Sequence, residues 1–356
     1  MKIFLNYLNL SRILILFLSL VFLNCQQKVR SHNWFAMDTN MSVSIYGSTP
    51  ISDDSVFSRL EKETEKYNEI FSDYSPVSGL SKIKGNKGDT LTIEPEIYSV
   101  LKIALKANQQ SCGSFDITLH TLKSLWGMGS GQQGKVPDSS TIDSIMQGNP
   151  TYHASYDSCN FPMPITMISE NRVVLERNNV LLDLGAIAKG YIIDRLDALL
   201  NTLGCPTHII QSGGEIRLGG KKAAGPWSVG IRHPRASDSL AGLISWAGPK
   251  AVSTSGDYER FFMENGKRYH HIFDPRQGRP SDKLCAVTVI TDSSVIADAL
   301  STSLFVLGPK RGLTLAKLHN ALVVWFEERN GNVCAIPMPE ILPYLDLNGT
   351  QLCQNP

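Results

Sequence analysis

The sequence predicts an α+β fold, a two-lobed body in which mixed or antiparallel sheets are flanked by helices. Helical periodicity dominates the first half of the chain, whereas short apolar strands dominate after Arg172. The chain has 356 residues, of which 42% are hydrophobic and 19% charged, as in folded globular proteins. The formal net charge is only +1 and the Lys and Arg residues are not clustered, which argues against a polybasic nucleic-acid binder.

The first residues have the pattern of an export signal. A basic start containing Lys2 and Arg12 precedes an apolar run over 13–23, which is too short to span a bilayer as a mature helix. The run leads to Asn24-Cys25, which resembles the cleavage site of a bacterial lipoprotein. We therefore expect a lipoprotein signal peptide over 1–24 and acylation of Cys25. The alternative is an ordinary signal peptide with an incidental Cys.

Both alternatives place the domain outside the cytoplasm. With acyl chains on Cys25, the protein would be anchored in the bacterial cell envelope, facing the periplasm or the outside of the inner membrane. We expect residues 25–33 to form a tether, residues 34–345 to form the folded domain, and residues 346–356 to form a C-terminal tail.

Within the domain the predicted elements follow one another without a clear linker. Residues 41–46 alternate with a period of two, which predicts a strand. Apolar residues at helical spacing predict helices over 53–73, 97–110, 189–203 and 294–307, and a short helix near 141–146 in a loop-rich stretch. The last two long helices are each followed by Gly and Pro, as helix ends prefer. Further strands are expected over 173–176, 180–184, 208–211, 227–231, 286–291, 321–326 and 333–336.

Two other patterns indicate little chemistry. Six cysteines follow Cys25 without a C-x-x-C pair, so we expect buried thiols or one or two disulfides rather than a zinc site. Residues 129–134 match G-x-G-x-x-G, the dinucleotide fingerprint, but the Lys-Val-Pro that follows does not open a helix. A flexible loop is the better interpretation.

The segment from Asp183 to Gly190 has the pattern of a strand end, a turn and a helix start. Backbone N–H groups at a helix N-terminus, with Lys189 beside them, suit a phosphate or pyrophosphate. The alternative is an ordinary connection with a surface Lys. Asp183 favours the functional interpretation, because a carboxylate between two Leu residues needs a partner.

The segment over 296–307 predicts a helix that is apolar nearly all round and is therefore buried. Asp298 and Thr302 lie one helical turn apart, with Ser301 beside them. Carboxylate and hydroxyl oxygens in this arrangement suit a hard cation such as Mg²⁺, which takes substrate oxygens and waters at its remaining positions. The alternative is a buried Asp that is hydrogen-bonded to backbone.

His271 precedes the turn Asp274-Pro-Arg276-Gln-Gly278 and is a candidate general base, although a His in a strand is more often structural. Two glycine turns, over 212–215 and 255–258, indicate close approach of backbone after strands.

These motifs occur with others in a fixed order: Met37-Asp38-Thr39, Phe71-Ser-Asp-Tyr74-Ser-Pro76, Gly113-Ser-Phe-Asp116-Ile-Thr118, Asp183-Leu-Gly-Ala-Ile-Ala-Lys189-Gly190, Thr254-Ser-Gly-Asp257-Tyr258, His271-Ile-Phe-Asp274-Pro-Arg276-Gln-Gly278 and Ala297-Asp298-Ala-Leu-Ser-Thr302. In this order they resemble the ApbE family, the FAD:protein FMN transferases, from Met37 to about Leu315. Members of this family take FMN from FAD and attach it through a phosphoester to Thr or Ser of acceptor proteins. AMP is released and Mg²⁺ is required.

The resemblance implies roles for the matching positions. The metal would be held by the backbone carbonyl of Ala186 and by Asp298, Ser301 and Thr302. The FAD site would be lined by Met37, Tyr74, Ser114, Phe115, Asp116, Asp183, Lys189 and Ile272.

The resemblance also implies attack by an acceptor hydroxyl on the FMN-side phosphorus, with AMP leaving. We expect His271 or Asp257 to take the hydroxyl proton, and we favour His271 because its ordinary pKa lies closer to neutral pH. The chain departs from the family in having Asp38 where Gly is usual. A hydroxyl also stands where many members have a second Asp, about one turn after Asp298.

Two other functions remain open from the sequence. An FAD pyrophosphatase would need only water in place of the acceptor, although an aromatic ring at Tyr74 could shield the cofactor from water. A lipoprotein that binds flavin without catalysis would not need a buried metal carboxylate. By family analogy, the acceptor is an exported or membrane redox protein carrying a Ser/Thr flavinylation motif.

Overall fold

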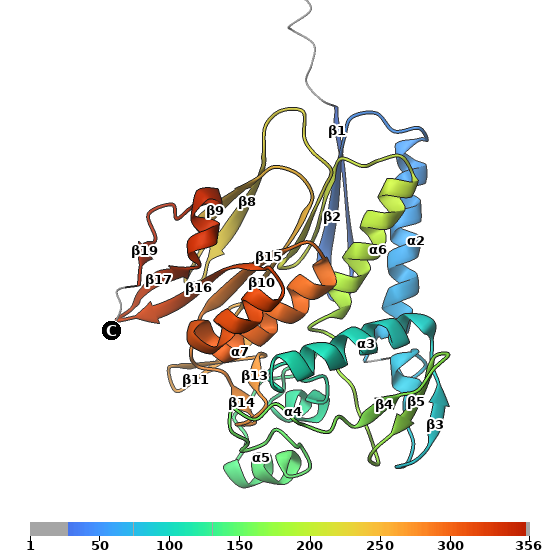
Figure 1. Ribbon diagram of the computed structural model, residues 1–356, viewed down its shortest axis with the longest axis vertical. Coiled ribbons are helices and arrows are strands. Elements are labelled where there is room, and N and C mark those ends of the chain that lie inside the picture. The colour runs from blue at the N-terminus through green and yellow to red at the C-terminus, as the bar shows by residue number, and fades with distance from the viewer. Residues whose placement is uncertain (1–27, 74, 130, 354–356) are drawn as a thin grey trace, which may run out of the picture.

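The computed structural model describes residues 28–73, 75–129 and 131–353. Its centre is a nine-stranded sheet, seen nearly edge-on in Figure 1. Every neighbouring pair in this sheet is antiparallel except the last pair, which is parallel. In order across the sheet, the strands are β1 (Val29–Ala36), β2 (Thr39–Tyr46), β6 (His208–Ser212), β7 (Glu215–Gly219), β10 (Lys250–Gly256), β15 (Ala286–Thr291), β16 (Leu322–Arg329), β17 (Asn332–Pro337) and β19 (Gln351–Leu352).

Four smaller sheets surround the central one. A three-stranded sheet of β8 (Trp227–His233), β9 (Ala236–Trp246) and β18 (Leu345–Asp346) belongs to the upper lobe, and one of β3 (Thr90–Thr92), β4 (Ile165–Met167) and β5 (Arg172–Leu175) belongs to the lower lobe (Figure 1). Two hairpins complete the set, β11 (Phe261–Glu264) with β12 (Lys267–His270) and β13 (Phe273–Asp274) with β14 (Arg279–Pro280).

Helices cover one face of the central sheet, as amphipathic and buried helices should. Figure 1 shows α2 beside α6 along the upper lobe, α7 across the middle, and α3 above the small β3–β5 sheet. The α-helices are α2 (Asp53–Phe71), α3 (Pro95–Gln110), α4 (His120–Leu125), α5 (Ser139–Met146), α6 (Ala188–Thr202) and α7 (Ser294–Leu318), and two short 3₁₀ turns are η1 (Leu80–Lys82) and η2 (Pro339–Tyr344). The predicted α+β class is confirmed. No helix within the described ranges is both long and apolar enough to cross a membrane.

Several predicted elements need correction. The predicted tether over 25–33 overlaps β1, which begins at Val29 and pairs with β2, while residues 25–27 lie outside the described part. Residues 180–184 form no strand, because the N–H of Asp183 bonds to the carbonyl of Ile117 in a loop contact and not in a ladder. The helix predicted to end at 307 does break at Gly308, which has φ +74°, but a second helical stretch continues from Pro309 to Leu318.

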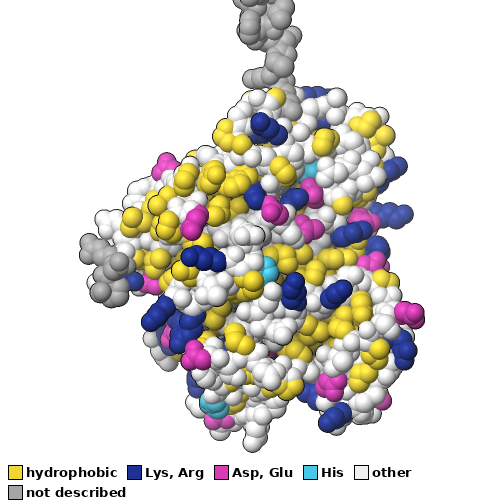
Figure 2. All heavy atoms as spheres, viewed as in Figure 1, with side chains coloured by type: hydrophobic (Ala, Val, Ile, Leu, Met, Phe, Trp, Pro, Cys, Tyr) yellow, Lys and Arg dark blue, Asp and Glu magenta, His cyan; other side chains and the backbone are white. Residues whose placement is uncertain are grey.

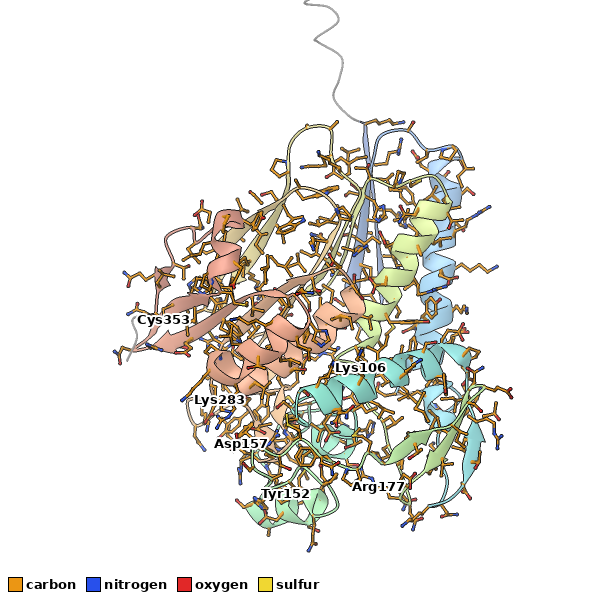
Figure 3. The ribbon with its side chains drawn as sticks, viewed as in Figure 1. Lys106, Tyr152, Asp157, Arg177, Lys283 and Cys353 are labelled. Atoms are coloured by element: carbon orange, nitrogen blue, oxygen red, sulfur yellow. A yellow bond between two sulfur atoms is a disulfide. The ribbon has the colours of Figure 1, made fainter. Side chains whose placement is uncertain are left out.

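The cysteines adopt both expected states. Cys112 is disulfide-bonded to Cys159 and Cys334 to Cys353, whereas Cys205 and Cys285 are buried free thiols. Cys353 lies at the C-terminal end of the described chain (Figure 3). The disulfides tie loops to the body, which stabilises the fold mainly by constraining the unfolded chain.

The crossing of α6 and α7 depends on one glycine. A Cβ on Gly190, in the first turn of α6, would lie 2.3 Å from the backbone oxygen of Ser294 and 2.8 Å from Cβ of Asp298. Both neighbours belong to α7, so neither can rotate away as a flexible side chain would. The absence of a side chain at Gly190 thus brings the starts of α6 and α7 together.

We expect Gly190→Ala to lower the free energy of unfolding by about 1–3 kcal/mol, because the two helices must separate to admit the methyl group. Urea unfolding of the purified chain measures this loss. Gly148→Ala is the control, because its Cβ would meet no atom within 4 Å and its φ is not positive. Equal stability of the two variants would contradict the close crossing.

Candidate active site

A buried cluster of opposite charges lies where α6, β7 and α7 meet. Nζ of Lys189 is 3.2 Å from Oε1 of Glu215 and 3.9 Å from Oδ1 of Asp298. The side chains of Glu215 and Asp298 are only 7% and 3% exposed, so the cluster is nearly dry and its charges interact strongly. We call these three residues the lysine–carboxylate cluster.

The helix starts hold this cluster in place. The N–H of Gly190 donates to Oδ2 of Asp298 at 2.9 Å, so α6 orients the carboxylate of α7. Asp194 of α6 caps α7, because its carboxylate accepts from the N–H groups of Ser294 at 2.8 Å and Val295 at 3.1 Å. The predicted burial and pairing of Asp298 are confirmed.

Two carboxylates share one lysine in this cluster. Burial raises the pKa of Glu215 to about 8, and the charge of Asp298 adds to the rise while Lys189 opposes it. Burial works against the charge of Lys189, but Asp298 and Glu215 more than offset it and hold the pKa of Lys189 above its usual value. The lysine is therefore cationic at neutral pH, whereas Glu215 favours its protonated form.

The cluster has the donors that a hard cation needs. Oε2 of Glu215 is buried and has no hydrogen-bond partner, and the carboxylate of Asp298 lies beside it in the same cluster. Oxygen donors of this kind suit Mg²⁺ better than zinc. Over the described residues, no group of three or more His, Cys, Asp or Glu side chains forms a complete metal site. A cation here would therefore also need backbone, hydroxyl, water or substrate oxygens.

Of the other predicted metal ligands, Ser301 and Thr302 share α7 with Asp298, and Ala186 precedes α6. Oγ of Ser301 donates to the carbonyl of Asp298 at 2.9 Å and lies 2.7 Å from Oγ of Ser255, so its hydroxyl serves a buried serine group. Thr302 is half-buried one turn after Asp298, and Ala186 is half-buried in the turn before α6. These contacts give Ser301 a structural role in this state.

A second charged group forms beside the α6 turn. Nζ of Lys123, on α4, lies 2.9 Å from Oδ2 of Asp183 and 3.8 Å from Oδ2 of Asp73. Oδ1 of Asp183 accepts from the N–H of Gly185 at 2.9 Å, which shapes the turn. Although burial opposes its charge, Lys123 and the Gly185 N–H lower the pKa of Asp183. The partner that Asp183 was expected to need is thus Lys123.

The remaining predicted flavin residues occupy separate elements. Met37 is half-buried at the tip of the β1–β2 hairpin and has φ +53°. Ser114 and Phe115 are buried, and Asp116 is held by Thr118 and Asn149. Ile272 is buried directly after His271. Tyr74 lies outside the described residues, so the structure does not place it.

His271 is half-buried and bound to one backbone group. Its backbone N–H donates to the carbonyl of Arg260 at 3.1 Å, and its Nδ1 lies 3.2 Å from the same oxygen. A donating Nδ1–H leaves Nε2 with the free lone pair. Burial, with the nearby His270 and Arg260, lowers the pKa of His271 to about 3. The expectation of an ordinary imidazole pKa was therefore wrong. The His271 side chain is uncharged at neutral pH.

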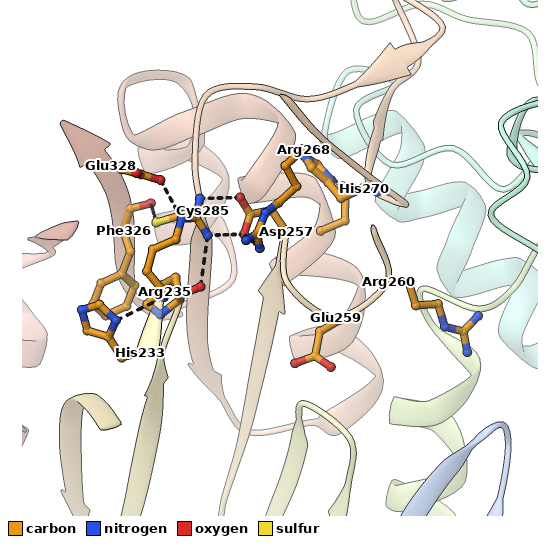
Figure 4. A network of polar contacts seen from close by, with 12 residues as sticks. His233, Arg235, Asp257, Glu259, Arg260, Arg268, His270, Cys285, Phe326 and Glu328 are labelled. Carbon is orange, nitrogen blue, oxygen red and sulfur yellow. Dashed lines mark hydrogen bonds and ion pairs between the residues drawn. The ribbon is translucent and has the colours of Figure 1, made fainter. Parts of the chain in front are cut away.

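Asp257 has a different environment from the one a base requires. Its two carboxylate oxygens each accept a hydrogen bond of 2.7 Å from Arg235, which also contacts Glu328 (Figure 4). Arg268 adds a second cation, 3.6 Å from Oδ1. Both carboxylate oxygens are therefore engaged by guanidinium N–H groups. These contacts argue against Asp257 as the proton acceptor, and the assignment of that role to His271 stays a prediction.

Sequence reasoning missed Glu215 and Lys123. Glu215 follows the Gly213-Gly214 turn, which was predicted to bring backbones together. That expectation is confirmed, because a Cβ on Gly214 would lie 2.4 Å from the carbonyl oxygen of Thr254. The turn packs on β10, so the side chain after it is directed inward. No sequence signal marked Lys123, which lies on a six-residue helix.

A buried lysine–carboxylate cluster at the start of two helices of an α+β fold is typical of an enzyme active site. The chain matches the model of the ApbE family over residues 37–326 and belongs to that family. The family resemblance seen in the sequence is confirmed.

The matching relatives are transferases by name. A protein of Haemophilus influenzae named "FAD:protein FMN transferase" is 31% identical over 320 residues, which cover 86% of this chain and 88% of that protein. A protein of Vibrio cholerae with the same name is 29% identical over 269 residues, covering 74% and 77%. The predicted class of enzyme, a transferase, is confirmed by these relatives.

Solved structures share the fold. The ApbE protein of Thermotoga maritima superposes with a TM-score of 0.77 at 28% identity, covering 89% of this chain and 99% of that one. The flavin transferase ApbE of Vibrio cholerae gives 0.76 at 25% identity with the same coverage.

Proposed function

We propose that this protein is an FAD:protein FMN transferase, which moves FMN from FAD to a Thr or Ser hydroxyl of an acceptor protein and releases AMP. The observation that carries the proposal is the lysine–carboxylate cluster, which lies in the part of the chain that matches the family. Family membership and the names of the relatives supply the substrate class.

The chain's own residues suggest how the site works. Lys189 provides a fixed positive charge near the start of α6, where backbone N–H groups also favour a pyrophosphate. Asp298 and Glu215 would hold Mg²⁺, with the Ala186 carbonyl and Thr302 as further oxygen donors. When bound, the metal would offset the charge that develops on the phosphates.

His271 is the proposed proton acceptor. Its Nδ1 is committed to the carbonyl of Arg260, so Nε2 is the atom that would receive the proton of the acceptor hydroxyl. Asp183 would contact FAD with Met37, Tyr74, Ser114, Phe115, Asp116 and Ile272 as further lining residues. Lys123 keeps the Asp183 carboxylate ionised for that role.

We also propose that Cys25 is acylated and that the domain faces the periplasm or the outside of the inner membrane. This rests on the sequence pattern of residues 1–25, which lie outside the described residues. Mass spectrometry of the envelope-extracted protein tests it. A lipid-modified N-terminal Cys supports the anchor, and an unmodified Cys25 or a different N-terminus contradicts it.

The reaction is tested by following its products with and without an acceptor domain. The full chain is incubated with FAD and Mg²⁺, and AMP and free FMN are quantified. A transferase forms AMP only when acceptor is present and leaves no equivalent amount of free FMN. Equal AMP and FMN without acceptor would instead identify a pyrophosphatase.

We expect the rate of flavin transfer to show no inflection near pH 6.5 from His271. Its pKa of about 3 keeps the imidazole neutral from pH 6 to 8. Initial rates at saturating FAD over this range measure the effect. An inflection that His271→Gln removes would contradict the environment described for His271.

The same lowered pKa has a consequence for stability. The pKa of His271 is 6.5 in the unfolded chain and about 3 in the folded one. The contribution of His271 to the free energy of unfolding is therefore fully present above pH 6.5 and is lost as the pH falls toward 3. The stability of wild type relative to His271→Gln should therefore decline between pH 7 and pH 4 in urea unfolding. A constant difference would show that His271 titrates alike in both states.

A further inference from the structure

A cavity of about 450 Å³ opens beside β12 and is distinct from the lysine–carboxylate cluster. Arg268 and His270 line it, whereas the neighbouring His271 and Ile272 do not. The opposite walls come from the segment after β14 and from the β16–β17 hairpin. Figure 4 shows part of its wall, with Arg268 and His270 beside Asp257.

The cavity carries an excess of positive charge. Five Lys or Arg side chains and three carboxylates line it, and Arg235 engages two of those carboxylates, Asp257 and Glu328. The third, Asp282, is exposed. The five cations, Arg235, Lys267, Arg268, Arg279 and Lys283, therefore exceed the three carboxylates of the cavity by two charges. Lys283 lies at the lower edge of the upper lobe in Figure 3 and is also 3.9 Å from the buried Asp274.

Two buried donors in the wall make no hydrogen bond. Ser281 is 4% exposed and its Oγ makes no hydrogen bond, although its backbone oxygen is held by Nε2 of His270 at 2.6 Å. Nη1 of Arg268 is also buried without a hydrogen bond, and its nearest carboxylate oxygen, on Asp257, is 3.6 Å away. Buried donors are nearly always satisfied in native proteins, so the Ser281 hydroxyl indicates a missing acceptor, and Arg268 has room for a closer one than Asp257.

We propose that this cavity binds the phosphate group of a small phosphomonoester. A tetrahedral dianion matches both the excess positive charge and donors that approach from different elements, which a planar carboxylate does not. The volume exceeds that of free phosphate, and the half-buried ring of Tyr269 in the wall offers an apolar surface to the rest of the molecule. The site is independent of flavin transfer, and Asp257 serves in it as the group that orients Arg235.

Equilibrium dialysis with labelled inorganic phosphate tests the proposal. The full chain is used with saturating FAD, so that the flavin site does not contribute. We expect one saturable site per chain. Ser281→Ala should weaken binding about 3–10-fold and Arg268→Gln about 10–100-fold, as for loss of a neutral and a charge-assisted hydrogen bond. Lys62→Gln, which removes an exposed cation of α2, should leave binding unchanged.

Competition by AMP and by adenosine distinguishes the sources of the phosphate. Displacement by AMP at lower concentration than by unlabelled phosphate, with none by adenosine, supports the phosphomonoester. Displacement by AMP no better than by phosphate overturns it in favour of a free oxyanion. Absence of saturable binding, or wild-type affinity in Ser281→Ala, overturns the site itself. The Ser281 variant decides the question if Arg268→Gln does not fold.

Discussion

Asp298→Asn is expected to reduce the rate of flavin transfer at least about 100-fold, the largest effect that the structure predicts on activity. The substitution keeps the size of the side chain and leaves an oxygen that can accept from the N–H of Gly190. It removes the charge that faces Lys189 and that a divalent cation would require. Rates are measured at saturating FAD and acceptor over a range of Mg²⁺ concentrations.

Ser303→Ala is the matched control for this variant. Ser303 lies on the same helix and is buried, but its hydroxyl donates to the carbonyl of Ala299 within α7 and does not reach the cluster. We expect its rate to stay within about twofold of wild type, since a neutral intrahelical hydrogen bond contributes little. Near-wild-type transfer by Asp298→Asn would show that the reaction does not use this carboxylate.

Lys189→Met is expected to cause the largest loss of stability, about 2–4 kcal/mol at pH 7–8. Without the cation, the carboxylate of Asp298 and the ionised fraction of Glu215 remain buried with no positive partner in the cluster, and breaking a buried pair in this way is costly. We expect a loss of stability at the lower end of what a broken buried ion pair costs, because Lys189 is 23% exposed and water screens part of its charge. Urea unfolding measures the loss.

Lys102→Met is the control for the charge itself, because Lys102 is exposed on α3. We expect its free energy of unfolding to change by less than about 0.5 kcal/mol. The loss in Lys189→Met should also shrink as the pH falls below about 8, since protonation of Glu215 removes its need for a cation. A Lys189→Met protein as stable as Lys102→Met would contradict the buried cluster.

The sequence predicted the parts of the site that a single segment determines. Asp298 could be found because a helix apolar nearly all round must bury its carboxylate, and Lys189 because it lies at a helix start. The Gly204 and Gly308 helix ends were also predictable, since both glycines adopt positive φ. These features depend on local spacing and on the conformational preference of individual residues.

The parts that were missed depend on contacts between distant segments. Glu215 is buried only because its turn packs on β10, and Asp257 is paired only because Arg235 reaches it from the turn between β8 and β9. The apolar run over 180–184 resembles a strand, but its alternation could not show that no neighbouring strand pairs with it. The low pKa of His271 likewise arises from burial and from charges on other segments.

The most direct test of flavin transfer uses the full chain, FAD, Mg²⁺ and an acceptor domain, separated on a denaturing gel and examined for flavin fluorescence. A parallel acceptor has its Thr or Ser hydroxyl removed by substitution with Val or Ala. The structure predicts a fluorescent band only with the intact acceptor, an equal amount of AMP, and loss of both on chelation or in Asp298→Asn. Intact FAD in every reaction, with several intact acceptors tried, would contradict flavin transfer by this protein.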